Sequence, residues 1–173
     1  MKLTGLRLAV GAAIMTAAIA IHAPLGPSAS SKDPALTVRG VGLGSSPKQI
    51  VSALGNPLRE VPGRPDDMPE MGPTKEMVYR GASFDLCKPE GQKEFHVYRV
   101  VIQDSSWTVN PGIRIGMARE QVVHILGQPN SISTDASSGQ ETLQYDFISF
   151  DGWYWMLLSK GRVVEIGATE DWS

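Results

Sequence analysis

The sequence contains a single cysteine, Cys87, among 173 residues, so no disulfide can form within the chain. This excludes the class of small exported scaffolds that disulfides hold together. Positive charge is also scarce, because 16 Lys and Arg stand against 18 Asp and Glu and give a net charge of −2. A chain without excess positive charge is not expected to bind nucleic acid or to dock on anionic lipid.

A hydrophobic run long enough to cross a membrane is missing as well. The run Leu8 to Ile21 has about 14 residues, short of the roughly 18 that a spanning helix needs. Lys2 and Arg7 precede it and Ala18 to Ala20 offers a cleavage site, which together predict a secretory signal peptide. We therefore expect residues 1–30 to be a signal peptide and mobile lead-in, and the mature chain to be periplasmic or secreted. An uncleaved N-terminal anchor is the alternative. No cysteine stands directly after the run, so no lipid anchor is evident.

Motifs for cofactors and metals are incomplete. Gly40 to Gly44 is a glycine-rich run before a predicted helix, where phosphates often bind, but no Walker lysine or Rossmann spacing follows it. Glu120 and His124 lie one helical turn apart, and two ligands do not make a metal site. We predict no cofactor, no metal and no catalytic residues.

Cys87 leaves one enzymatic alternative open. Lys88 follows it directly and His96 lies nine residues further on, so a thiolate and a histidine could form a nucleophile pair. The other interpretations of Cys87 are a small buried apolar residue and an unpaired surface thiol.

What the chain does have is an internal repeat. Gly40 to Leu58 and Gly112 to Asn130 match at an offset of 72 residues, and such self-similarity defines a structural unit. The paired positions include Gly44 and Gly116, Gln49 and Gln121, Ile50 and Val122, Leu54 and Leu126, and Gly55 and Gly127.

Each copy has the signals of a short helix. In the first, Ser46 is a good N-cap, Pro47 suits the first helical position, Gln49 completes a capping box, and Gly55 ends the helix. Ala118 stands where the second copy would need a cap, which should cost roughly 1 kcal/mol of local stability. Isolated helices this short are unstable in water, so each needs a surface to pack on.

The residues after each helix predict strands. Segments rich in Val, Ile, Tyr, Phe and Trp follow each copy, and Ser159-Lys160-Gly161 predicts a hairpin turn. The segment 61–75 is rich in proline, glycine and acids and is expected to be a long loop. The predicted strand segments and their matches are Phe95 to Gln103, Trp153 to Ser159 and Arg162 to Ala168, with Tyr79 matching Tyr145 and Ser83-Phe84-Asp85 matching Ser149-Phe150-Asp151 at an offset of 66.

The predicted fold class is therefore α+β, with two tandem modules that each pack a short helical segment on an antiparallel β-sheet. The first module covers residues 36–104, residues 105–111 form a linker, and the second module covers residues 112–173.

Aromatic residues are the strongest candidates for binding. On a strand, Trp153 and Trp155 share one face and Tyr154 takes the other. One face must meet the helix, so the other sends large apolar groups outward, where Trp and Tyr are favoured as interface anchors. Burial of both faces between modules is the alternative. We predict Trp153, Tyr154, Trp155 and the linker residue Trp107 as protein-binding residues.

The second copy resembles a known family. Gly116 to Val122 reads G-M-x-x-E-Q-V, Leu126 to Pro129 reads L-G-x-P, and an aromatic strand and a closing G-R-V-V-E-I strand follow. This pattern resembles the SmpA/OmlA (BamE-like) domain, which belongs to the group shaped like the β-lactamase inhibitory protein. Members of that family are non-enzymatic outer-membrane lipoproteins that serve the machinery inserting β-barrels. This chain differs by lacking the lipidated cysteine and by having two modules.

The resemblance implies an exported bacterial envelope protein that is not an enzyme and binds another envelope protein. A role in outer-membrane or envelope assembly or maintenance is one form of this prediction. The alternative is a periplasmic or secreted inhibitor of an enzyme, and the third hypothesis is a small thiol-dependent enzyme that uses Cys87 and His96.

Overall fold

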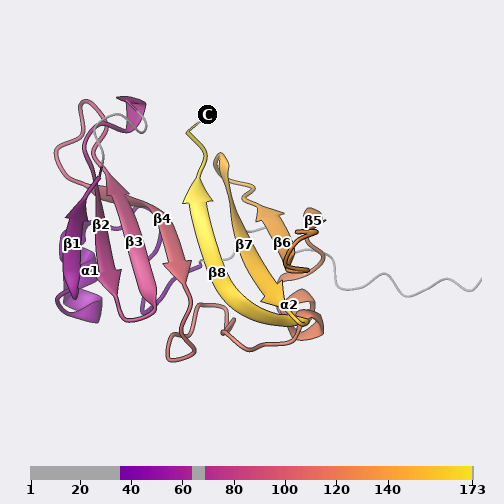
Figure 1. Ribbon diagram of the computed structural model, residues 1–173. Coiled ribbons are helices and arrows are strands. Elements are labelled where there is room, and N and C mark those ends of the chain that lie inside the picture. Colours follow the sequence, from indigo (N-terminus) through magenta and orange to yellow (C-terminus); the bar gives the residue numbers. More distant parts are fainter. Residues whose placement is uncertain (1–35, 64–68, 173) are drawn as a thin grey trace, which may run out of the picture.

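The computed structural model describes residues 36–63 and 69–172, and its eight strands and two α-helices confirm the α+β fold class (Figure 1). The signal peptide and lead-in predicted for residues 1–30 lie outside the described residues. Within the described ranges no helix is long and apolar enough to cross a membrane. In chain order the elements are α1 (Pro47–Leu54), β1 (Arg59–Pro62), the 3-10 helix η1 (Pro69–Met71), β2 (Thr74–Tyr79), β3 (Ala82–Cys87), β4 (His96–Ile102), α2 (Arg119–Leu126), β5 (Ser131–Thr134), β6 (Glu141–Asp146), β7 (Gly152–Ser159) and β8 (Arg162–Glu170).

All eight strands belong to one antiparallel sheet, in the order β1-β2-β3-β4-β8-β7-β6-β5. This corrects the prediction of a separate sheet for each helix. The two strand runs join where β4 pairs with β8, from Arg99 opposite Thr169 to Ile102 opposite Ile166. The physical reason is that two separate sheets would each leave the backbone N–H and C=O groups of these strands unpaired at an edge.

Both helices cover the same face of this sheet and share one hydrophobic core with it (Figure 1). Ser46 and Gln49 form the predicted capping box at the start of α1. At α2 only half of this box is present, because the Gln121 side chain accepts from the Ala118 N–H at 3.0 Å and Ala118 has no side chain that could cap the helix. Fully buried positions are Ile50 and Val122, the first apolar residue of each stripe. The leucines that end the two helices, Leu54 and Leu126, are only half-buried.

Two tyrosines tie the helix ends to the sheet. The hydroxyl of Tyr79 donates to the carbonyl of Gly55 at 2.8 Å, and that of Tyr145 donates to the carbonyl of Gly127 at 3.3 Å. Each glycine ends its helix, where carbonyl groups lack a partner within the helix. The predicted match between Tyr79 and Tyr145 thus corresponds to one contact made twice.

The strand boundaries differ from the predictions at two places. Segment 61–75 is not one long loop, since it contains the end of β1, all of η1 and the start of β2. Ser149-Phe150-Asp151 forms part of the turn between β6 and β7 and does not match the strand residue Phe84. In the sheet Phe84 pairs with Met77, and the residue paired with Leu143 in β6 is Met156. The residue equivalent to Phe84 is therefore Met156, six residues beyond the predicted match Phe150, because the turn after β6 is longer than the turn after β2. A similarity of three residues did not reveal this longer turn.

The hairpin predicted at Ser159-Lys160-Gly161 is confirmed. Ser159 pairs with Arg162, so Lys160 and Gly161 alone make the turn. Their φ angles are 51° and 72°, both in the left-handed region that a two-residue hairpin of this kind requires.

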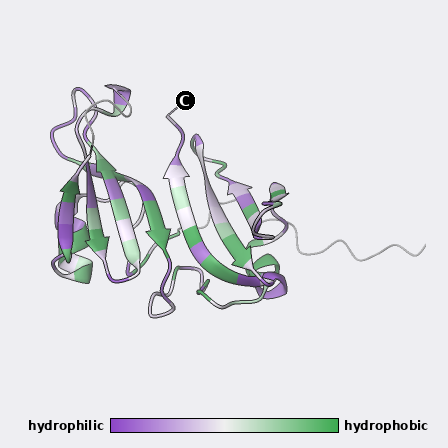
Figure 2. Cartoon of the chain, viewed as in Figure 1, coloured by the Kyte–Doolittle hydropathy of each residue, from purple (hydrophilic) through white to green (hydrophobic). Residues whose placement is uncertain are grey.

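The two faces of the sheet differ in character. Hydrophobic and hydrophilic residues are mixed along single strands, as the green and purple bands on β8 show (Figure 2). In β7 the side chains of Tyr154, Met156 and Leu158 are buried toward the helices, and the residues between them are partly exposed. We call the face that carries these intervening residues, which neither helix covers, the open face.

Candidate functional site

A hollow of about 840 Å³ lies on the open face. Its sides are formed by β4, β6, β7 and β8, and residues of η1 and of the chain end after β8 also line it. We call this cavity the hollow; its lining residues are Glu70, Met71, Tyr98, Arg99, Thr142, Gln144, Trp153, Trp155, Leu157, Glu165, Thr169, Glu170, Asp171 and Trp172.

Strand alternation decides which predicted aromatic residues reach the hollow. Trp153 and Trp155 line it, as expected for one face of β7. Tyr154 points the other way, is 4% exposed, and stacks on Tyr145 with ring centroids 5.0 Å apart. Its side of the strand faces the helix-covered core, so Tyr154 does not line the hollow, and its role as a binding residue stays a prediction.

Trp107 is also absent from the hollow. Its indole N–H donates to the carbonyl of Arg80 at 2.8 Å, and its ring meets the edge of Tyr79 at 6.5 Å. Tyr79 belongs to the core under the helices, so Trp107 packs against that layer. These contacts fix the chain after β4 and place Trp107 outside the hollow, and its role as a binding residue stays a prediction.

Trp155 forms the floor of the hollow in a fixed orientation. A Cβ atom at Gly167 would overlap its six-membered ring, so the ring lies directly on the Gly167 backbone. The indole N–H donates to one oxygen of Glu165 at 2.8 Å, and the other oxygen accepts from the Gln103 amide at 2.9 Å. The guanidinium of Arg99 lies 5.8 Å from the ring centroid. These contacts hold the ring in place before any ligand arrives.

Sequence reasoning missed Tyr98 and Arg99. Asp85 pairs with Arg99 and the next residue, Leu86, pairs with Val97, which leaves Tyr98 as the extra residue of a β-bulge. A bulge lets two consecutive residues face the same side of a sheet. Simple alternation from Val97 therefore could not place both residues on the hollow, and no glycine or other local signal marks the bulge.

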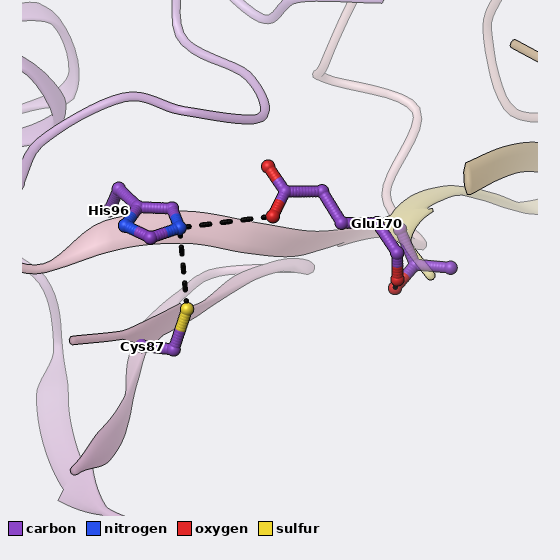
Figure 3. Close-up of polar contacts among 4 residues, drawn as sticks. Cys87, His96 and Glu170 are labelled. Atoms are coloured by element: carbon purple, nitrogen blue, oxygen red, sulfur yellow. Dashed lines mark hydrogen bonds and ion pairs between the residues drawn. The ribbon is translucent and has the colours of Figure 1, made fainter. Parts of the chain in front are cut away.

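The Cys87 region forms a second polar cluster (Figure 3). Cys87 and His96 are cross-strand neighbours, and the Cys87 Sγ atom lies 3.4 Å from His96 Nε2. Glu170 approaches the same nitrogen, with Oε2 at 3.8 Å. In a nucleophile triad the thiol and the carboxylate contact opposite ring nitrogens, so that the carboxylate orients the base. Here both partners meet one nitrogen, and the arrangement does not have that geometry.

No protein-family model matches the sequence, and no curated protein sequence matches it. Among solved structures, an extracellular protein containing an SCP domain from Bacillus anthracis is similar with a TM-score of 0.51 at 14% identity. The match covers 87% of this chain and 50% of that chain, so this chain spans half of that protein's length. The comparison shows a shared fold. A DUF4309 family protein, YjgB, from Bacillus subtilis has a TM-score of 0.43 at 13% identity, with 73% of this chain and 79% of that chain covered.

The thiol of Cys87 stays protonated at neutral pH, whereas a nucleophile needs the thiolate. It is fully buried, and burial raises its pKa to about 12, with the Glu170 carboxylate adding to the increase. Only a thiolate attacks or binds metal, so a thiol with this pKa stays inert at neutral pH. Within residues 36–63 and 69–172, no three His, Cys, Asp or Glu side chains are grouped so that they could hold a metal ion.

We expect Cys87 in the folded chain to resist alkylation by iodoacetamide at mildly alkaline pH. The raised pKa lowers the thiolate fraction by on the order of a thousandfold relative to an ordinary cysteine, and burial blocks access in addition. Mass spectrometry of timed samples measures the rate, with the urea-unfolded chain as control. Equal rates in the two states would show that the thiol is reactive and would restore the enzymatic hypothesis.

Asp85, on the open face, makes the stability of the folded chain depend on pH. Burial raises its pKa from 3.8 to about 6, Arg99 at 3.6 Å opposes the increase, and Glu76 adds to it. The folded chain therefore favours protonated Asp85. This stabilisation is fully present below pH 3.8 and is lost as the pH rises through about 6.

We expect the difference in free energy of unfolding between the Asp85→Asn variant and the native chain to shift in favour of the variant as the pH rises from 4 to 7. Because the carboxyl remains 19% exposed, the relative gain should be on the order of 1 kcal/mol. Urea unfolding at both pH values measures it, and Asp146→Asn, an exposed carboxyl on the same face, is the control. A difference between native chain and Asp85→Asn that does not change with pH would contradict the shift.

Proposed function

We propose that this chain is an exported, non-enzymatic protein-binding module of the bacterial envelope that contacts its partner through the hollow. The observation that carries the proposal is the gathering of Trp153, Trp155 and Trp172 in a cavity on a sheet face without a covering layer. Monomeric proteins rarely leave large aromatic groups in such a position unless they bind something. Trp side chains are also the commonest anchors of protein interfaces.

The proposal includes the two tandem modules. The order of one helix and four strands occurs twice along the chain. Gly44 N–H donates to the carbonyl of Val97, and the matching Gly116 N–H donates to that of Val163. At the centre of the sheet Val101 pairs with Gly167, and these residues are themselves equivalent at the offset of 66. A two-fold relation between two modules would place this pair on its axis.

The predicted signal peptide supports the proposed export, and the resemblance to the SmpA/OmlA domain supports the proposed place in the envelope. Under this proposal the partner is another envelope protein, and envelope assembly or maintenance is the process served. An enzyme-inhibiting role is a special case of the same binding, in which the captured partner is an enzyme and loses activity when bound.

We expect Trp153→Ala to weaken capture of the partner by about tenfold or more, because it removes an aromatic anchor from the lining of the hollow. The partner is first identified by cross-linking to the chain in envelope extract, and its affinity is then measured by calorimetry with purified proteins. Leu58→Ala is the matched control, because Leu58 is 74% exposed and lies outside the hollow.

Circular dichroism must show that each variant remains folded. Capture that survives Trp153→Ala and Trp155→Ala but disappears with Cys87→Ser would refute the proposed surface and favour the thiol hypothesis. An assay of the captured partner, if it is an enzyme, separates inhibition from assembly.

A further inference from the structure

The charge of the hollow is one-sided. Among its lining residues are four carboxylates and a single cationic side chain, Arg99. Arg99 does not balance them, because its guanidinium is already shared between Asp85 at 3.6 Å and the ring of Trp155. The carboxylates are Glu70, Glu165, Glu170 and Asp171.

The four carboxylates differ in their surroundings. Glu165 is occupied by Trp155 and Gln103 and forms part of the floor. Glu70 and Asp171 are exposed at the end of the hollow where η1 and the chain after β8 meet it. Glu170 directly precedes Asp171 in the chain, and its Oε2 atom lies 3.8 Å from Nε2 of His96. Negative charge is therefore concentrated at one end.

Apolar surface lies next to this charge. Trp153 and Leu157 occupy the same face of β7 as Trp155 and line the hollow. Asp146 pairs directly with Trp153 and adds a further carboxylate beside its ring. The chain already places cations over aromatic rings, with Arg99 on Trp155 at 5.8 Å and Lys75 on Phe95 at 5.3 Å. Such contacts are favourable where the cation is partly removed from water.

We infer that the hollow binds a segment of the partner protein that carries lysine or arginine side chains, an inference that rests on the proposed function. The aliphatic stems of these side chains lie against Trp153 and Leu157, as long cationic side chains do on apolar surface. Their charged groups reach Glu170, Glu70 and Asp171. The cavity of about 840 Å³ matches a few side chains, in the range of about 300–1,000 Å³ typical of pockets that enclose a ligand.

The state of Glu170 agrees with this occupant. Burial raises its pKa, while His96 and the Trp172 side chain lower it. A half-buried carboxylate is stabilised in its charged form by an approaching cation, and it repels an anionic segment. The hollow therefore selects by charge as well as by shape.

Two synthetic peptides test the inference on the purified chain. In the first, arginine alternates with threonine, and in the second, glutamate replaces arginine at the same length. Fluorescence anisotropy of labelled peptides gives the affinity, and the indole N–H signals of Trp153 and Trp155 in NMR spectra show the place of binding. We expect the arginine peptide to bind about tenfold or more tightly than the glutamate peptide, to shift both indole signals, and to bind more weakly at high salt.

Variants separate the hollow from the general negative charge of the chain. Glu170→Gln and Asp171→Asn should each weaken the arginine peptide by about threefold to tenfold. Glu120→Gln on α2 removes one carboxylate from the opposite side of the sheet and should leave the affinity within about twofold. Unchanged affinity in both hollow variants, or equal binding of the two peptides, would overturn the inference.

Failure of this inference can be distinguished from failure of the proposed function. If neither peptide binds while partner capture still depends on Trp153, the cationic occupant is wrong and the binding role stands. If capture is also independent of Trp153 and Trp155, both fail.

Discussion

Replacing Phe84 by alanine is expected to lower the free energy of unfolding by about 3–5 kcal/mol, the range for truncating a buried phenylalanine. Phe84 is fully buried in the core beneath the helices. It pairs with Met77 across β2 and β3, and its ring meets the edge of Tyr79 at 5.8 Å. Removing the ring leaves a cavity that the paired strands cannot close without breaking their ladder. Urea unfolding followed by circular dichroism measures the loss.

Ile132→Ala provides the control. Ile132 lies on the edge strand β5 and is 49% exposed, so its truncation should change stability by less than about 0.5 kcal/mol. Because one core contacts both helices, we also expect a single unfolding transition in each variant. A loss below about 1 kcal/mol in Phe84→Ala, or a separate transition for residues 112–172, would contradict the shared core.

Introducing valine at Gly167 is expected to cost about 1–3 kcal/mol of stability, the usual effect of overfilling a packed site. The backbone at Gly167 does not need glycine for its φ angle, so the cost comes from the side chain alone. A Cβ atom there overlaps the Trp155 ring and forces it off the floor of the hollow. The ring then loses its hydrogen bond to Glu165, and its fluorescence should shift to the red as water reaches it.

A double variant isolates this clash. In a Trp155→Ala background, Gly167→Val should cost almost nothing, since the group that it strikes is gone. Val101, which pairs with Gly167 across β4 and β8, shows that a valine is compatible with the sheet at this level. An equal cost of Gly167→Val with and without Trp155 would mean that the ring does not rest on the glycine.

Much of the local structure followed from the sequence because its causes are local. Ser46, Gln49 and Gly55 bound α1 through hydrogen bonds within a few residues, as the pattern predicted. Lys160-Gly161 formed the predicted turn for the same reason. The placement of Trp153 and Trp155 together on one face of the sheet followed from the period of two along a strand.

The remaining features depend on contacts between distant residues. The single sheet arises from the pairing of β4 with β8, whose partners are over sixty residues apart and carry no mark in either strand. The bulge at Tyr98 depends on the register between β3 and β4. The pattern of β7 separated Tyr154 from its neighbours, but the pattern alone did not say which of the two faces the helices would cover. The carboxylates of the hollow come from η1, β8 and the chain end, so no single stretch of sequence contains the site.

The position of β1 and β5 at the two margins of the sheet has a consequence for the behaviour of the chain in concentrated solution. Each margin offers backbone groups that another molecule could use to extend the sheet into a polymer. Both marginal strands are only four residues long, and β1 carries Arg59 and Glu60 and ends at Pro62, which has no N–H to donate. The margins therefore resist the growth of intermolecular sheets, and aggregation requires partial unfolding that exposes the longer strands inside.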